Sequence, residues 1–350
     1  MTTALLYGAT GYTGHLIAGM ATAAGLHPVL AGRDRAGVAR VAEALGLPFR
    51  VFPLDDPAAL RAGLDGIAAV LHCAGPFSRT SRPMASACLA AGAHYLDITG
   101  EIAVFEQLAA RDAEARAAGI TLLPGVGFDV VPSDCLAAHL ARRLPGATSL
   151  LLGLQGSGRL SRGTLTTAIE NQHRGGAIRR GGALVAVPAA WRTRRIDFGR
   201  GPRTAVTIPW GDVATAWYST GIPDIEVYAA VPAPLRRAMR ASRHLGWLLG
   251  SRWVRGLMLR WVQAGPAGPS PGELAQGRST IWGRVEDPTG RSAEARVHGP
   301  EGYLLTARAA LAILRRVLEG GAPTGFQTPS RALGADFILE IEGITREDLP

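Results

Sequence analysis

The stretch "LLYGATGYTGHLIAGMA", Leu5 to Ala21, places three glycines between a short apolar run and a run of good helix formers. Gly8, Gly11 and Gly14 have the spacing G-x-x-G-x-x-G, directly after a predicted strand and directly before a predicted helix. In that context the first glycine permits a sharp exit from the strand, and the second removes a Cβ where a pyrophosphate must approach the backbone. The third lets the helix pack close to the sheet. The pattern predicts a dinucleotide-binding loop, and the alternative is a purely structural tight turn.

The helix that follows this loop presents free backbone N–H groups and a partial positive charge at its N-terminus, which suits phosphate groups. Thr10, Tyr12 and Thr13 lie where their hydroxyl groups can add contacts to the same phosphates. We therefore expect these three residues to bind the cofactor together with the three glycines.

The second predicted strand indicates which dinucleotide binds. It ends in "LAGRDR", which places Arg33 nineteen residues after Gly14. A guanidinium group at this place pairs with the 2′-phosphate of NADP, whereas a carboxylate would hold a ribose hydroxyl and select NAD. Asp34 leaves the alternative open, because it is either that carboxylate or the cap of the next helix. We expect NADP(H).

The first 125 residues alternate between strand and helix patterns. We expect strands at 3–7, 28–33, 49–54, 67–75, 94–99 and 120–125, and helices at 13–24, 35–45, 56–64, 83–92 and 101–118. Asp56 and Pro57 suit the first positions of the third helix. Short apolar strands that alternate with helices predict an α/β fold, a Rossmann-type doubly wound parallel sheet over residues 1–125.

The pattern changes after Pro124, and we expect a mixed α/β domain for substrate binding and association over residues 126–300. A helix capped by Ser133 is predicted to open it. Strands are predicted at 149–156, 203–210, 215–221, 224–231, 279–287 and 292–299, and helices around 162–174, 234–262 and 302–319. The last of these helices, within a segment 301–350, is expected to pack back on the first domain.

The fourth predicted strand ends in "HCAGPF", and its carboxyl end should lie under the nicotinamide half of the cofactor. We expect Ala74, Gly75, Pro76 and Phe77 to line that half of the site. Two further loops, 95–101 and 125–134, follow the next two strands and should meet at the same crevice.

Three polar residues are candidates for catalysis. Glu101 and Asp129 lie in the two loops just named, beside Asp97 and Asp134, and a carboxylate near the cofactor can serve as acid, base or substrate anchor. His173, in the polar segment 161–182, is a candidate proton donor. The structural alternatives are that Glu101 begins a helix that Thr99 caps and that His173 is simply solvated.

Composition excludes several classes of function. The 350 residues carry a formal net charge of +9, yet the sequence contains no lysine, so all 37 basic residues are arginines. They are spread along the chain, most densely from Arg174 to Arg203, without a nucleic-acid-binding motif, so we expect anionic small ligands and no nucleic acid. Without lysine there is no Schiff base and no Tyr-x-x-x-Lys pair of the short-chain dehydrogenase type.

The cysteines and histidines do not form a metal-binding pattern. Cys73, Cys88 and Cys135 are far apart with no CxxC, and no HxxxH or HExxH occurs, so no metal is expected. The start of the chain is not a signal peptide, and no 18-residue uncharged apolar run is present. We expect a reduced, cytoplasmic protein, with a membrane-associated one as the alternative.

The segment 244–262 is rich in tryptophan and arginine. As a helix it would place Trp247, Leu257 and Trp261 on one side, with Val254 and Met258, and its arginines toward the other. Three interpretations remain open: a core or dimer helix, a wall for a long apolar substrate, or a helix that lies on a membrane surface.

The motifs "GATGYTG", "AGR", "HCAGPF", "YLDITGE" and "PGVGFDVVPSD" together resemble the saccharopine dehydrogenase-like NADP-binding oxidoreductases, including the bacterial trans-acting enoyl reductase branch. The resemblance implies a Rossmann domain followed by a mixed α/β domain whose sheet often supports dimerisation, so we expect a homodimer. It also implies that Gly8, Gly11, Gly14 and Arg33 bind the cofactor and that loops 97–101 and 125–134 border nicotinamide and substrate. The lysine-forming saccharopine dehydrogenases are thought to use a lysine for proton transfer, which this chain lacks.

The sequence therefore predicts an NADPH-dependent reductase that transfers hydride to the C=C bond of an enoyl, lipid-like or polyketide-like substrate, or to a C=N bond. One alternative is a non-catalytic NADP-binding sensor or scaffold of the NmrA type. The other is an imine-reducing amino-acid dehydrogenase of the saccharopine type.

Overall fold

The computed structural model describes residues 3–171, 175–243 and 251–350, which form two compact units. The first unit consists of Met1–Val131 and Tyr303–Leu333, and the second of Pro132–Gly302 and Gly334–Pro350. The C-terminal segment expected to pack back on the first domain is thus divided between the units. Its helix belongs to the first unit, and the last residues belong to the second.

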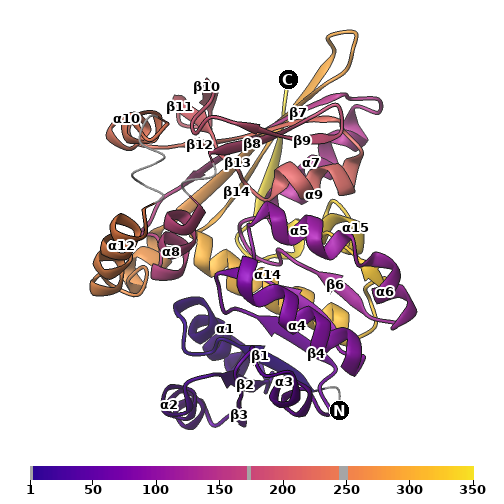
Figure 1. Cartoon of the computed structure of the whole chain (residues 1–350). Helices are drawn as coiled ribbons and strands as arrows, with labels where there is room; N and C mark the ends of the chain where they lie inside the picture. The colour runs from indigo at the N-terminus through magenta and orange to yellow at the C-terminus, as the bar shows by residue number, and fades with distance from the viewer. Residues whose placement is uncertain (1–2, 172–174, 244–250) are drawn as a thin grey trace. The chain divides into compact units, whose positions relative to one another are not determined.

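The first unit is a parallel sheet covered by helices (Figure 1). Within the described residues its seven strands have the order β15-β6-β5-β4-β1-β2-β3, and all neighbouring pairs are parallel. The elements, in chain order, are β1 (Ala4–Tyr7), α1 (Tyr12–Ala23), β2 (Val29–Gly32), α2 (Arg35–Leu45), β3 (Phe49–Val51), α3 (Pro57–Gly63), β4 (Ala69–His72), α4 (Phe77–Ala91), β5 (His94–Asp97), α5 (Ile102–Ala109), α6 (Asp112–Ala117), β6 (Thr121–Leu123), α14 (Gly302–Leu318), β15 (Gly325–Phe326) and α15 (Pro329–Leu333). The predicted Rossmann fold is confirmed, and the strand order reverses between β1 and β4, where ligands bind in such sheets.

Local sequence explains most of these elements. Strands β1, β2 and β4 are buried along their whole length, as expected for strands covered on both faces. Asp56 caps α3 by accepting bonds from the N–H groups of Ala58 and Ala59, and Pro57 takes the first helical position, as predicted. The helix predicted over 101–118 is divided into α5 and α6, because Arg111 leaves the helical conformation at φ −101° and ψ 13°.

The second unit is built on a mixed sheet (Figure 1). Its described strands follow the order β10-β11-β12-β7-β13-β14-β16, with β8 between β12 and β9, and β12 pairs parallel with β7 while the other pairs are antiparallel. The elements are α7 (Val131–Arg143), β7 (Ser149–Gly156), α8 (Arg162–Asn171), β8 (Gly176–Arg180), β9 (Ala183–Val187), β10 (Thr193–Asp197), β11 (Pro202–Thr207), α9 (Asp212–Thr220), β12 (Asp224–Ala230), α10 (Ala233–Ala241), α12 (Arg252–Ala264), α13 (Pro271–Gln276), β13 (Arg278–Glu286), β14 (Ser292–Pro300), η2 (Phe337–Glu340) and β16 (Thr345–Leu349).

Two local predictions in this unit were wrong. The strand predicted at 215–221 is part of helix α9, which ends where Gly221 adopts the left-handed conformation and its N–H bonds to the carbonyl of Trp217. Ser133 does not cap a helix, because α7 already begins at Val131. The Ser133 hydroxyl instead donates to the buried carboxylate of Asp212, over 2.9 Å. Of the helix predicted over 234–262, the structure describes α10 and α12. Across the described residues, no helix combines the length and the apolar character that a bilayer span requires.

Candidate cofactor site and active site

The glycine loop after β1 closes so tightly that side chains cannot enter it. A Cβ on Gly14 would lie 2.2 Å from the carbonyl oxygen of Gly8, and one on Gly8, whose φ is +92°, would lie 2.8 Å from the backbone nitrogen of Ala74. The N–H of Gly11 donates to the carbonyl of Gly8 over 3.0 Å. The glycine positions therefore offer only backbone at the point where β1 and β4 diverge, which is the shape that a pyrophosphate needs.

Helix α1 begins directly behind this loop, and its N-terminus suits an anion. Gly11 is its N-cap and has no side chain, and the first turn contains no acidic residue. The first N–H groups and the helix dipole consequently favour a phosphate. Thr10 is exposed at the tip of the loop, whereas the ring of Tyr12 packs edge-on against Tyr303, with 5.2 Å between ring centroids.

Arg33 extends from the end of β2 and is exposed, and no carboxylate of the described residues lies within ion-pair distance of it. Asp34 occupies the N-cap position of α2, although its side chain makes no capping bond. Its carboxylate lies over Gly37, where a Cβ would be 2.5 Å from Oδ2. Arg33 is thus an unneutralised cation beside the glycine loop, and these residues fit an NADP dinucleotide.

The segment that follows β4 is held in place by hydrogen bonds from Thr80 and by the packing of Phe77. The hydroxyl of Thr80 donates to the carbonyls of Ala74 and Pro76, over 2.7 and 3.1 Å. Gly75 is exposed, and its peptide bond to Pro76 is cis. The ring of Phe77 points the other way, into the sheet, where it packs edge-on against His72 at 5.5 Å. Phe77 therefore anchors the segment, and Ala74 to Pro76 form its accessible edge.

Glu101 supports the same segment from the next loop. Its carboxylate is almost fully buried and accepts the backbone N–H groups of Phe77, over 2.7 Å, and Ser78, over 3.3 Å. These are the first N–H groups of α4, so Glu101 caps that helix with a negative charge. The N–H of Glu101 in turn donates to the hydroxyl of Thr99 over 3.1 Å, one residue before α5 begins.

Asp97, the last residue of β5, joins the two loops that were predicted to meet. Its buried carboxylate accepts hydrogen bonds from the Tyr95 hydroxyl (2.6 Å), the Thr99 N–H (2.9 Å) and the Gly125 N–H (3.0 Å). Burial raises the pKa of Asp97 to about 6, although these hydrogen bonds favour the ionised form. The prediction that the loops lie together is confirmed, and the role of Asp97 there is structural.

Asp129 lies against Gly100, where a Cβ would be 2.9 Å from its Oδ2. Burial raises the pKa of Asp129 to about 7, so its carboxyl group is half-protonated near neutral pH. The N–H of Phe128 donates to the hydroxyl of Thr306, over 3.0 Å, which fixes the loop to helix α14. Thr306 and Tyr303 were not found from the sequence, because no local pattern links the start of α14 to loops so far away in the chain.

Asp134, named above beside the candidate carboxylates, belongs to the second unit. Asp134 accepts a hydrogen bond from the Ser219 hydroxyl in the second unit, and His173 lies outside the described residues. Burial raises the pKa of the Cys73 thiol, which keeps it protonated. In the part of the chain that the structure describes, no three histidine, cysteine or acidic side chains are grouped to hold a metal ion.

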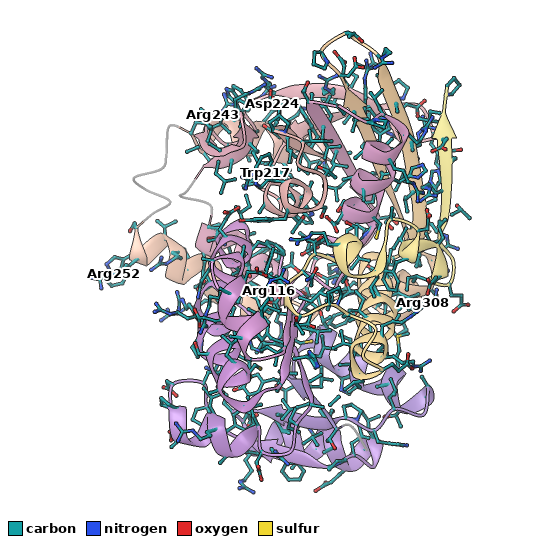
Figure 2. The ribbon with its side chains drawn as sticks, turned by 90° about the vertical axis from the view of Figure 1, so that its right-hand side faces the viewer. Arg116, Trp217, Asp224, Arg243, Arg252 and Arg308 are labelled. Carbon is teal, nitrogen blue, oxygen red and sulfur yellow. The ribbon has the colours of Figure 1, made fainter. Side chains whose placement is uncertain are left out.

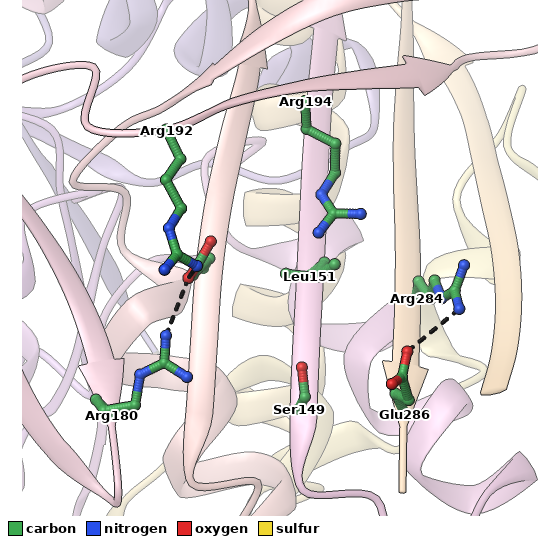
Figure 3. A pocket seen from close by; sticks show the side chains of 8 residues that line it. Ser149, Leu151, Arg180, Arg192, Arg194, Arg284 and Glu286 are labelled. Carbon is green, nitrogen blue, oxygen red and sulfur yellow. Dashed lines mark hydrogen bonds and ion pairs between the residues drawn. The ribbon is translucent and has the colours of Figure 1, made fainter. Parts of the chain in front are cut away.

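The arginine-dense segment contributes to a pocket of about 270 Å³ on the second sheet (Figure 3). Glu226 pairs with Arg192 over 2.8 Å and with Arg180 over 3.2 Å, and Arg284 pairs with Glu286 over 3.2 Å. The pocket is lined by Ser149, Leu151, Arg180, Arg192, Arg194, Glu226, Arg284 and Glu286. Because three of its four guanidinium groups already pair with a carboxylate, it is an ion-pair network more than an open anion site.

Comparison with known proteins agrees with this geometry. Residues 4–123 match the family model of the saccharopine dehydrogenase NADP-binding domain, and this match supports NADP(H) as the cofactor. Apo saccharopine dehydrogenase (L-Glu forming) from Saccharomyces cerevisiae has a similar structure, with a TM-score of 0.67 over 100% of both chains at 12% identity. That likeness shows that the two proteins share a fold.

Sequence relatives occur among mycobacterial proteins. A Mycobacterium tuberculosis protein provisionally named a trans-acting enoyl reductase is 37% identical over 156 residues, which are 42% of this chain and 37% of the relative. A trans-acting enoyl reductase of Mycobacterium leprae is 33% identical over 151 residues, or 40% of this chain and 35% of the relative. The chain thus spans little more than a third of these relatives in each alignment.

Proposed function

We propose that the chain is an NADPH-dependent reductase that transfers hydride to a C=C or C=N bond of a small molecule. The observation that carries the proposal is the tight glycine loop, which lies at the strand switch point before a helix whose first turn has no acidic residue. The NADP-binding domain family of residues 4–123 supports it. When bound, the reduced nicotinamide supplies the hydride.

Different residues of the chain bind different parts of the cofactor in this proposal. Backbone N–H groups at the start of α1 hold the pyrophosphate, and Arg33 pairs with the 2′-phosphate. Ala74, Gly75 and Pro76 leave room for the nicotinamide end because they present little side chain. Glu101, through its bonds to Phe77 and Ser78, is a positioning residue that keeps this edge in place.

Asp129 is the proton donor in this proposal. Reduction of a double bond needs one hydride and one proton, and its carboxyl group, with a pKa raised to about 7, holds a proton at working pH. It lies over Gly100, on a loop that follows the sheet strand β6 and is tied to the loop after β5. The ionised carboxylate regains its proton from solvent after each turnover.

The names of the mycobacterial relatives favour a C=C bond of an enoyl substrate over a C=N bond. The absence of lysine from the sequence also argues against copying the proton transfer of saccharopine dehydrogenases. We therefore propose enoyl compounds as the first substrate class to examine and imines as the second.

Calorimetry with NADPH and NADH tests the cofactor part. Arg33→Gln should weaken NADPH binding about 10- to 100-fold, since a charge-assisted bidentate pair is lost, and leave NADH binding unchanged. Arg40→Gln, a change at another exposed arginine on α2, is the matched control. Equal loss for both cofactors would show that Arg33 does not contact the 2′-phosphate.

Stopped-flow measurement of NADPH oxidation with a panel of enoyl thioesters and cyclic imines tests the chemistry. Turnover of enoyl compounds, with much slower oxidation by imines, is the expected result. Tight NADPH binding without oxidation by any compound would instead support a non-catalytic sensor. Failure to bind either dinucleotide at millimolar concentration would remove the proposal altogether.

A further inference from the structure

Helix α12 carries the most exposed large apolar side chains of the described residues. Trp253, Leu257 and Trp261 are 90%, 71% and 76% exposed, whereas the other exposed large apolar residues reach at most 51%. The spacing of four residues places all three on one face of the helix. Single exposed apolar residues are common, but a continuous stripe of this kind marks an interaction surface.

The opposite face of α12 is held by the rest of the second unit. Val262 is buried, and the helix packs against α8. Where α12 ends, the guanidinium group of Arg162 donates from the first turn of α8 to the carbonyl of Gly265, over 2.6 and 2.9 Å. The stripe is therefore presented by a helix anchored along its other side.

The residues that flank the stripe along the chain carry charge of one sign. Between Glu226 and Glu273 the sequence contains seven arginines and no acidic residue. Arg252 and Arg260 are exposed on α12 itself, and Figure 2 shows Arg252 at the outer end of that helix. The neighbouring helix in the chain, α10, has no buried residue, and it adds further exposed arginines beside Leu235.

We propose that α12 docks on the surface of a bilayer that contains anionic phospholipids. Tryptophan prefers the boundary between headgroups and acyl chains, and arginines at the edges of an apolar stripe pair with lipid phosphates. A second copy of the chain is disfavoured as the occupant, because its α12 would bring arginines against arginines. The proposal does not depend on the reductase assignment.

Flotation of the full-length protein with vesicles tests this surface. Vesicles of phosphatidylcholine mixed with phosphatidylglycerol should carry the protein upward, and vesicles of phosphatidylcholine alone should carry much less. The double variant Trp253→Ser/Trp261→Ser should lose at least about tenfold in vesicle affinity, because its stripe retains only Leu257. Both side chains are exposed, so folding should be unaffected.

Two further variants give the controls. Leu339→Ser removes an exposed apolar residue elsewhere on the same unit and should leave vesicle binding unchanged. Arg252→Gln/Arg260→Gln should weaken binding to anionic vesicles and reduce its salt dependence. Thermal unfolding and NADPH binding, measured on every variant, should match the unmodified protein, which separates this test from the test of the cofactor site.

Three results would overturn the proposal. The unmodified protein could fail to bind either kind of vesicle, or the double tryptophan variant could bind as well as the unmodified protein. The third result is a protein that ignores vesicles but sediments as a dimer, with the double variant sedimenting as a monomer. In that case the stripe is an interface between two copies of the chain.

Discussion

Two helices of the first sheet begin after neighbouring strands, and their N-termini differ in whether a carboxylate of the protein accepts their first N–H groups. Helix α1, after β1, begins at Gly11, which has no side chain, and no side chain of the described residues accepts from the N–H groups of Thr13 and Gly14. Helix α4, after β4, receives the buried carboxylate of Glu101 on its first N–H groups. Both termini attract negative charge. One is already satisfied by the protein, so the comparison shows why a phosphate should bind at α1 and not at α4.

The largest loss of cofactor affinity is expected when a side chain is added at the N-terminus of α1. In Gly14→Ala the new methyl group would overlap the carbonyl of Gly8, at 2.2 Å, and only a shift of backbone relieves that. We expect a loss of about 100-fold or more in NADPH affinity and about 2–3 kcal/mol in the free energy of unfolding. Calorimetry and denaturant titration measure the two quantities.

Gly19→Ala is the matched control, on the same helix. A Cβ at Gly19 meets no atom within 4 Å, so alanine should keep NADPH affinity and stabilise the helix by about 0.5–1 kcal/mol. If both variants bind NADPH equally well, the tight loop is a structural turn only, and the N-terminus of α1 does not bind the cofactor phosphates.

The next effect concerns the two carboxyl groups near the capped terminus. Glu101 is committed to backbone N–H groups, whereas Asp129 has a pKa raised to about 7 and can exchange a proton. Asp129→Asn should lower kcat about 100-fold and leave NADPH affinity unchanged, because asparagine keeps the size of the side chain but cannot donate the proposed proton. Asp65→Asn, at an exposed acid of the same unit, is the control.

The pH dependence of kcat gives a second measurement on Asp129. The protonated form is the active one, so kcat of the unmodified protein should fall as pH rises through about 7. This limb should be absent from Asp129→Asn. A limb that persists in the variant would transfer the role of proton donor to another group or to water.

Removal of the cap should cost stability more than chemistry. Glu101→Ala leaves two N–H groups of α4 without their acceptor, and we expect a loss of about 1–3 kcal/mol in the free energy of unfolding. Glu101→Gln keeps one acceptor oxygen and should lose less. A kcat reduced a hundredfold in a variant of unchanged stability would instead make Glu101 a catalytic residue.

The N-termini of α1 and α4 also differ in how far the sequence could predict them. The spacing of Gly8, Gly11 and Gly14 is local, so the open loop, its strand and its helix followed from a short stretch of residues. The cap on α4 joins Glu101 to Phe77, residues 24 positions apart, and no pattern in the sequence distinguishes a capping carboxylate from a catalytic one. Only the fold brings them together.

Long-range contacts explain the other omissions. Tyr303 and Thr306 lie on α14, where the chain returns to the first unit, so their contacts with Tyr12 and Phe128 could not be predicted from local sequence. The predicted strand at 215–221 failed because a pattern of seven residues fits a strand or one face of a short helix. Packing in the second unit decided between them, and a single sequence does not contain that information.

The smallest effect, on the free energy of unfolding, is expected at His72, the last residue of β4. Both ring nitrogens of this fully buried histidine lack a hydrogen-bond partner among the described residues, and aromatic rings of Tyr7, Phe77 and Tyr95 surround it. A buried polar group without partners destabilises a fold, so His72→Phe or His72→Leu should raise the free energy of unfolding by about 1 kcal/mol at pH 8.

The pH dependence of that gain follows from the direction of the shift. Burial lowers the pKa of His72 from 6.5 to about 3, so between these values the unfolded chain binds a proton that the folded chain does not. The contribution of His72 to stability should therefore fall as pH falls from 6.5 toward 3, and the advantage of the His72 variants should grow. Asp97 and Asp129, whose raised pKa values act in the opposite direction, are common to all variants and cancel in the difference. Denaturant titrations at pH 8 and pH 5 measure it, and an advantage that stays constant would mean that the folded protein accommodates a charged His72.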